Sequence, residues 1–352
     1  MRYFAISRLL SFSLLGAVIL TGCNSLVDED MSDCGDKLDL GYELQLVTNM
    51  RTEIKTVLDL QADLQVATVL EEHLGEVFTD FAHDVDLSFY DTAGDMARLE
   101  HLDVVMNASQ SSYSLLIPAR PYMHTCVANL DTDPHITLED ADYCHSARLV
   151  QHLAVKDTAD AHLSGIFTAR KRMDIISGID QRFDVSLYMV NAATALVLDM
   201  TDAPGVKDLK VFLRGLADGF RLADSTYTFD TDYVVRTKLL ATEAGSTERC
   251  YVSTHFPSRD VDPATKAVID IEDPDGDKYS GDPLWFWEVY ATMEDGSVTK
   301  STLDVHSPVH AAQLKVVKAT VHANGGLFTG DHAVGATVTL DWGDGGKHDI
   351  EI

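Results

Sequence analysis

The chain has 352 residues, and its 27 basic residues against 56 acidic ones give a formal net charge of −29 at pH 7. A surface this acidic repels phosphate backbones, so we exclude nucleic acid as a partner. Hydrophobic residues make up 45% of the chain, which is enough for packed cores, and the length favours two domains over one.

Residues 1–22 have the features of a secretory signal peptide. Basic Arg2 and Arg8 precede an apolar run, residues 9–20, that is too short to span a bilayer. Cys23 directly follows Leu20-Thr21-Gly22, and this order resembles a bacterial lipobox. In a lipobox the cysteine thiol is alkylated by a diacylglycerol group, so we expect a lipid anchor at Cys23. An ordinary signal peptide followed by a chance cysteine is the alternative.

Residues 23–36 form an acidic tether between this anchor and the body of the protein. Their Asp28-Glu29-Asp30 run predicts a solvated, flexible segment. Asn24 follows Cys23 where an inner-membrane retention signal has Asp. We therefore expect the protein at the outer membrane, exposed on the cell surface.

The first half of the body alternates between strand and helix patterns. Residues 38–46 alternate strictly between apolar and polar, which predicts a half-buried strand. Between residues 52 and 81 apolar residues recur every three or four positions, which predicts one or two amphipathic helical segments. Further strands are expected at 85–90, 112–118, 122–130, 166–175 and 182–190, with a short helix within 136–153. These elements predict an N-terminal β-sandwich domain over 37–191 with a helical insert.

The second half contains only strand patterns. Turn residues separate short apolar runs at intervals close to the 8–12 residues typical of sandwiches. The expected strands lie at 196–200, 208–214, 225–230, 232–241, 250–256, 285–293, 314–323, 337–342 and 349–352. We therefore predict a C-terminal β-sandwich domain over 192–352 and an all-β protein overall.

The order of these features behind the lipobox resembles that of the FimB-like fimbrial anchor lipoproteins of type V pili. The tether and Cys34 precede the alternating strand, and the helical insert ends in Phe78-Thr79-Asp80-Phe81-Ala82-His83. The strand 85–90 with Asp91-Thr92-Ala93-Gly94, and later Leu115-Leu116-Ile117-Pro118-Ala119-Arg120, complete the pattern. The resemblance implies two transthyretin-like sandwich domains. It also implies a role at the base of a fimbrium, where the anchor holds the filament on the outer membrane.

Stalk subunits of such pili polymerise by strand donation, in which a strand of one subunit fills a groove in the next. Two segments of this chain are candidates for such pairing, residues 38–46 and the C-terminal residues 336–352. We expect Asp349, Ile350, Glu351 and Ile352 to pair with the first stalk subunit. Alternatively, both segments are ordinary strands of closed sandwiches.

No enzyme motif stands out, and we expect neither catalysis nor a cofactor. The chain has no G-x-S-x-G, no H-E-x-x-H and no phosphate-binding glycine loop. Ser297-Val298-Thr299-Lys300 matches S-x-x-K, but the companion motifs are missing and the segment reads as a polar loop.

Two weaker patterns concern metal and disulfide bonds. Asp273, Asp275 and Asp277 place carboxylates at alternate positions, as in calcium loops, but no distal Glu completes the set and a solvated turn is favoured. An even number of cysteines remains after Cys23, and a Cys126–Cys144 disulfide is the most local pairing. Free buried cysteines fit equally well.

An aromatic cluster supplies the main alternative function. On a strand, Trp285 and Trp287 share one face and Phe286 points to the other. With Tyr290 they are candidates for a sugar-binding platform, which would make the chain a glycan- or ligand-binding lipoprotein. Core packing of the tryptophans is the favoured interpretation.

Overall fold

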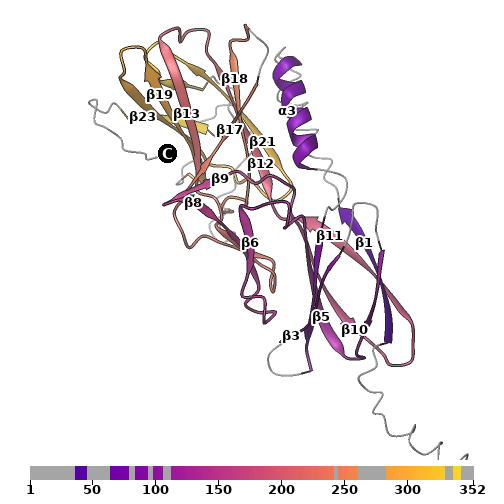
Figure 1. Ribbon diagram of the computed structural model, residues 1–352. Coiled ribbons are helices and arrows are strands. Elements are labelled where there is room, and N and C mark those ends of the chain that lie inside the picture. Colours follow the sequence, from indigo (N-terminus) through magenta and orange to yellow (C-terminus); the bar gives the residue numbers. More distant parts are fainter. Residues whose placement is uncertain are drawn as a thin grey trace, which may run out of the picture.

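The computed structural model describes residues 36–45, 64–78, 84–93, 98–105, 112–241, 245–260, 283–329 and 336–341. In these ranges the protein is all-β, with twenty-three strands and one helix. The predicted fold class is therefore confirmed. Figure 1 shows an elongated molecule with one sandwich at each end.

The N-terminal sandwich is one seven-stranded sheet folded onto itself. Its strand order is β3-β2-β5-β10-β11-β1-β4. β10 and β11 pair only at Phe167–Met189 and Thr168–Tyr188, so the sheet divides there into layers of four and three strands. Alternate residues of both layers are buried in the same hydrophobic cluster. The strands are β1 (Asp36–Gln45), β2 (Val85–Asp91), β3 (Arg98–Val105), β4 (Ser112–Ile117), β5 (Pro121–Ala128), β10 (Phe167–Asp174) and β11 (Gln181–Met189).

The C-terminal sandwich consists of two separate sheets, ordered β17-β18-β12-β21-β22 and β23-β20-β19-β13-β16-β9-β8. Their facing sides share a hydrophobic cluster that includes Trp285, Trp287 and Leu196. The strands are β8 (Leu153–Val155), β9 (Thr158–Asp160), β12 (Ala192–Asp199), β13 (Val206–Arg214), β16 (Val234–Arg236), β17 (Lys238–Leu240), β18 (Glu248–His255), β19 (Trp285–Met293), β20 (Val298–Val305), β21 (Leu314–Val321), β22 (Leu327–Phe328) and β23 (Ala336–Asp341).

The two sandwiches share one topology. β1 pairs in parallel with β11 and antiparallel with β4, and β12 pairs in the same way with β21 and β18. The order β3-β2-β5-β10 in the first corresponds to β16-β13-β19-β20 in the second. The chain thus contains a structural duplication that its sequence does not reveal. β23 extends this arrangement along the edge of β20.

The helix α3 (Leu64–Val77) lies between β1 and β2 in the sequence, as predicted, but it packs against the C-terminal sandwich. Its buried residues Val66, Leu70 and Leu74 are spaced by four, so they form one apolar stripe. They share a cluster with alternate residues of β12 and β18. α3 therefore covers the face of the five-stranded sheet that points away from the tryptophans (Figure 1), and β12 is buried on both faces.

A small four-stranded sheet joins the two sandwiches. It contains β6 (Ile136–Glu139), β7 (Arg148–Gln151), β14 (Gly219–Arg221) and β15 (Thr226–Thr228). The short helix predicted within residues 136–153 is therefore wrong, because β6 and β7 pair as antiparallel strands. β7 pairs with β14, and β9 with β16, so strand pairing links residues before 191 to residues after 192. The domain limits 37–191 and 192–352 stay predictions.

Candidate functional site

The candidate site for partner binding is the free edge of β23. A strand at the edge of a sheet presents unpaired N–H and C=O groups, which are the groups that pair with a strand of another chain. One side of β23 pairs with β20, from Ala336–Val305 to Asp341–Lys300. Within the described ranges, no strand pairs with its other side. β23 lies in the upper sandwich of Figure 1, whereas β1 begins in the lower one.

Several predicted site residues lie outside the described residues. They are Cys23, Asp273, Asp275, Asp277, Asp349, Ile350, Glu351 and Ile352. Where the structure does describe the chain, no group of three or more His, Cys, Asp or Glu is placed to hold a metal ion. In the same ranges, no helix has the length and apolar character needed to cross a membrane.

The favoured core packing of the tryptophans is confirmed, and the alternative sugar-binding platform is wrong, because both tryptophans are fully buried. Trp285 and Trp287 have no exposed surface, and their ring centroids lie 6.1 Å apart inside the core. The Trp285 indole donates a hydrogen bond to the carbonyl oxygen of Ser307 (2.9 Å). Tyr290 is also buried. These aromatic side chains are unable to stack on a sugar in solution, so the glycan-binding alternative loses the feature that suggested it.

The opposite face of β19 carries a buried charged cluster around Glu288. Oxygen Oε1 of Glu288 lies 2.9 Å from Lys300 Nζ and 3.2 Å from Arg214 Nε, and Oε2 accepts a hydrogen bond from the Tyr290 hydroxyl (3.2 Å). Burial acts to raise the pKa of Glu288, but the hydrogen bond from Lys300 and the charge of Arg214 outweigh it and lower that pKa. The carboxylate is therefore ionised and stabilises this face of the sheet.

This cluster also explains the S-x-x-K match. Val298 and Lys300 belong to β20, so the predicted polar loop over residues 297–300 is wrong beyond Ser297. The Ser297 hydroxyl donates to Asp295 Oδ1 (2.6 Å) in an exposed turn, while Lys300 contacts Glu288. Serine and lysine thus serve two different structural contacts.

The predicted Cys126–Cys144 disulfide is not formed. Both residues are buried free thiols, and they belong to different hydrophobic clusters. Cys250 is a third buried free thiol. Burial raises the pKa of each thiol, to about 12 for Cys250, so these cysteines stay protonated and inert at neutral pH.

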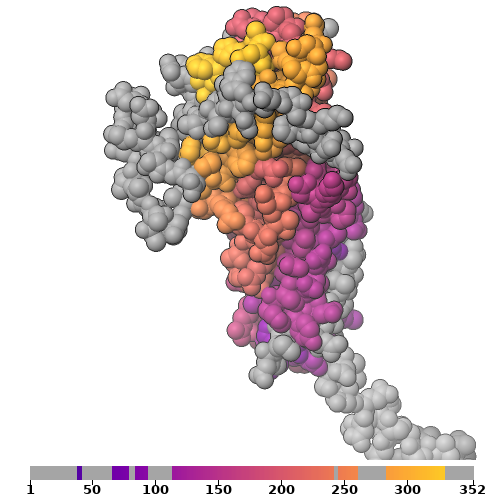
Figure 2. Space-filling model, turned by 90° about the vertical axis from the view of Figure 1, so that its left-hand side faces the viewer, coloured from indigo at the N-terminus to yellow at the C-terminus, as the bar shows by residue number. Residues whose placement is uncertain are grey.

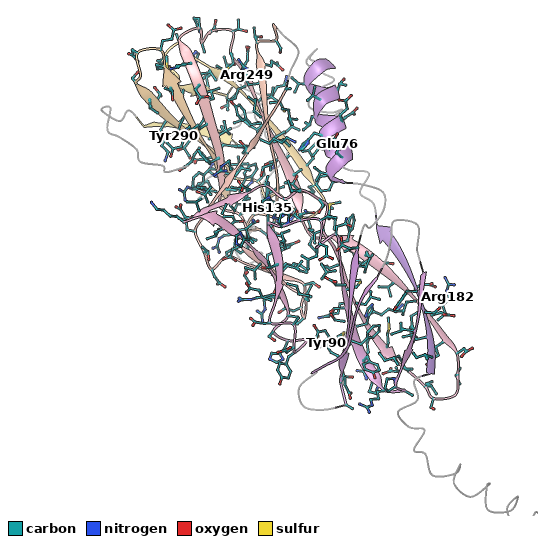
Figure 3. All side chains as sticks on the ribbon, viewed as in Figure 1. Glu76, Tyr90, His135, Arg182, Arg249 and Tyr290 are labelled. Carbon is teal, nitrogen blue, oxygen red and sulfur yellow. The ribbon has the colours of Figure 1, made fainter. Side chains whose placement is uncertain are left out.

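A network of buried polar side chains fixes the junction between the sandwiches. Asn191, between β11 and β12, donates to the carbonyl oxygen of Ser164 (2.8 Å) and accepts from the amide of Ile166 (3.2 Å). Asp133 accepts hydrogen bonds from the amides of Leu163 (2.7 Å) and Ser164 (3.3 Å). Figure 3 shows His135 beside this junction, between the two sandwiches. The connection from β11 to β12 is therefore buried and hydrogen-bonded.

Two buried histidines belong to the same junction. His162 Nε2 donates to Gln151 Oε1 (2.6 Å), and its backbone amide donates to the carbonyl oxygen of Thr254 (2.8 Å). His255 Nδ1 donates to the carbonyl oxygen of Phe256 (2.7 Å), and Nε2 accepts from the Thr194 hydroxyl (3.0 Å). Both rings are therefore neutral, and burial lowers the pKa of both, to about 4 for His255.

Acidification should destabilise the protein through such histidines. Burial also lowers the pKa of His124 to about 4, against an ordinary value of 6.5. Below pH 6.5 these histidines bind protons in the unfolded chain but stay neutral in the folded chain, so the free energy of unfolding decreases as the pH falls. His124 and His255 should each remove about 2 kcal/mol at pH 5 relative to pH 7. Urea unfolding at both pH values should show this loss reduced in His124→Gln/His255→Gln.

The exposed His145 provides the control for this prediction. Its replacement by Gln should leave the pH dependence as it is in the native chain. Burial raises the pKa of Asp86 to about 6, so this residue makes the folded chain more stable as the pH falls, opposite to the histidines. The informative quantity is therefore the difference in pH dependence between variants. An identical loss of stability at pH 5 in the native chain and the double variant would contradict the prediction.

The comparisons with known proteins concern the fold. No protein-family model matches the chain, and no curated protein is significantly similar to it. A candidate adhesin from Bacteroides ovatus has a similar structure, with a TM-score of 0.50 and 10% identity, covering 90% of this chain and 98% of that one. The similarity shows a shared fold over nearly the full length.

Two further solved structures are similar at lower scores. The fimbrial anchor protein Mfa2 from Porphyromonas gingivalis has a TM-score of 0.43 and 10% identity, covering 72% of this chain and 78% of that one. A candidate polysaccharide-binding protein from Bacteroides thetaiotaomicron has a TM-score of 0.46 and 7% identity, covering 87% and 95%. The structural neighbours thus include a fimbrial anchor protein and candidate adhesins.

Proposed function

We propose that this chain is a lipid-anchored fimbrial anchor or assembly subunit of the outer membrane. Cys23 holds it in the membrane, and its C-terminal end pairs with the first stalk subunit of a type V pilus by adding a strand. We propose no catalytic activity and no cofactor. The observation that supports this function best is the placement of β1 and β23 in sandwiches at opposite ends of the molecule (Figure 1).

This placement suits an anchor for a physical reason. The tether runs into β1, so the N-terminal sandwich lies nearest the membrane and the C-terminal sandwich lies farther out. Among the strands that the structure describes, β23 is an edge strand of the outer sandwich, so its backbone groups would be available at the end that a filament reaches first. The buried junction holds the two ends together, which a filament anchor under tension requires.

The strand-pairing part of the proposal is tested at the C-terminus. On a strand, Ile350 and Ile352 share one face and Asp349 and Glu351 the other. Added strands gain specificity from apolar side chains at alternate positions. Ile350→Ser/Ile352→Ser should therefore lower filament attachment by at least about tenfold, since losing two buried isoleucines removes about 3 kcal/mol. Co-purification of stalk subunits and counts of attached filaments are the measurements.

Asp349→Asn/Glu351→Gln is the matched control, because it changes the other face of the same segment. This variant should retain attachment. Normal attachment after deletion of residues 347–352 would refute pairing through this segment while leaving the lipid anchor untouched.

A further inference from the structure

The turn between β10 and β11 exposes two large apolar side chains. Ile176 is 55% exposed and Ile179 is 52% exposed. Leu116, near the end of β4, is 68% exposed. Scattered apolar residues are normal on a protein surface, but a group of three at one end needs an explanation.

The strand register brings these residues to the end where β1 begins. Leu116 pairs with Lys37, and Leu38 pairs with Gln181, which directly follows the turn. Figure 1 shows the β10–β11 turn and the start of β1 at the same lower end of the N-terminal sandwich. Leu116 therefore lies on one side of the start of β1, and the turn with Ile176 and Ile179 on the other.

The turn is built to hold its isoleucines outward. Gln181 Oε1 accepts a hydrogen bond from the Ile176 amide (2.7 Å), and its Nε2 donates to the carbonyl oxygen of Asp174 (3.3 Å). Gly178 has a φ of 74°, which permits a tight reversal that other residues rarely adopt. Ile175, just before the turn, is buried. Ile176 and Ile179 are thus presented to the surroundings by a fixed backbone.

The charge near this turn differs from that of the whole chain. The net charge of the protein is −29, yet residues 170–182 carry more basic than acidic side chains. The basic residues are Arg170, Lys171, Arg172 and Arg182, and the acidic ones are Asp174 and Asp180. Figure 3 shows Arg182 on the outer side of the N-terminal sandwich. Arg172 pairs with Asp174 (3.5 Å) and Arg182 with Asp184 (3.2 Å), so Arg170 and Lys171 are the basic residues of this range that favour contact with anionic headgroups.

We propose that this end of the sandwich lies on the bilayer that holds Cys23, with Ile176, Ile179 and Leu116 inserted among the lipid headgroups. Twelve residues separate Cys23 from Asp36, so the lipidated end lies at most about 45 Å from the start of β1. The tether keeps the effective concentration of membrane near the turn high, so a small apolar area suffices for contact. The inference rests on the proposed lipid anchor.

Fluorescence quenching in vesicles tests this contact. The lipidated mature chain with Cys34→Ser and Ser177→Cys is labelled at residue 177 with an environment-sensitive dye, since the buried thiols do not react. It is reconstituted into vesicles of phosphatidylethanolamine and phosphatidylglycerol that contain brominated acyl chains. Bromine should quench this dye at least about threefold more strongly than a dye at Ser297→Cys, an exposed position in the C-terminal sandwich.

Variants separate the contact from the anchor. Ile176→Ser/Ile179→Ser should reduce the quenching at residue 177 to the value at residue 297, whereas Leu239→Ser/Phe328→Ser, two exposed apolar residues elsewhere, should not. Equal quenching at both positions in a chain whose mass shows the lipid would overturn the contact and leave the anchor standing. The membrane contact would also be overturned if the native chain proved to be a dimer and Ile176→Ser/Ile179→Ser dissociated it. In that case a second copy of the chain would cover the turn. An unlipidated chain would instead refute the anchor.

Discussion

The Cys23→Ser variant should leave the membrane fraction of cells almost completely. The thiol of Cys23 is the only atom group through which the predicted lipobox attaches a diacylglycerol. Each buried methylene of an acyl chain contributes about 0.8 kcal/mol to membrane binding, so two or more acyl chains hold a protein stably in the membrane. A protein without any acyl chain retains only weak membrane contacts. We expect the membrane-bound amount to fall by more than about a hundredfold.

Cell fractionation and intact-mass measurement check this result. Cys34→Ser is the matched control, because it makes the same substitution eleven residues further along the chain. That variant should stay in the membrane fraction with its lipid mass. A Cys23→Ser protein that remains membrane-bound would show that another part of the chain provides the attachment.

Trp287→Ala should lower the free energy of unfolding by about 3–5 kcal/mol. Trp287 is fully buried between the sheets of the C-terminal sandwich, and its removal leaves a cavity that the surrounding strands are unable to fill. A loss of this size is a large part of the stability of a typical domain. Urea unfolding followed by far-ultraviolet circular dichroism gives the measurement without depending on tryptophan fluorescence.

Phe286→Ala is the control for this prediction. Phe286 is adjacent in β19 but points to the opposite face and is only partly buried. Its replacement should cost about 1 kcal/mol. Equal losses in both variants would contradict the assignment of the two faces. Any ligand binding lost in Trp287→Ala must be interpreted with this instability in mind.

Strands with strong local patterns were predictable from the sequence. Residues 285–293 match β19 at both ends, because aromatic and β-branched residues dominate the segment. The strand at 298–305 was missed, because Thr299 and Ser301 occupy its inward positions. The Thr299 hydroxyl donates to the carbonyl oxygen of Asn324, and the Ser301 hydroxyl accepts from the Leu327 amide. Because their hydroxyl groups are hydrogen-bonded, these polar residues can occupy buried positions, and the strand then lacks the apolar alternation that would predict it.

The junction was harder to predict because its pairing is distant in sequence. β7 has four residues and β14 has three, which is too few for a periodic pattern. Their pairing joins Leu149 to Phe220, about seventy positions along the chain. In Figure 2 the magenta surface of the N-terminal half borders directly on the orange surface of the C-terminal half. Such contacts are tertiary, and no local window of sequence contains them.

For the aromatic cluster, the sequence predicted the two faces of the strand and favoured burial of the tryptophans, and the structure confirms both. Trp285 and Trp287 share a face, as period-two alternation requires, and Phe286 lies on the other. The edge position of β23 depends on its pairing with β20, a strand that the sequence pattern did not reveal.

The position of α3 constrains how the protein is made. The helix is encoded before residue 78, yet the apolar stripe it carries has its counterpart on β12 and β18, which are encoded after residue 191. A chain synthesised from its N-terminus produces the helix more than a hundred residues before those strands. Meanwhile the stripe must be shielded by a chaperone or remain unfolded. If the two halves were expressed separately, each would expose apolar surface, the stripe of α3 in one and the face of β12 and β18 in the other.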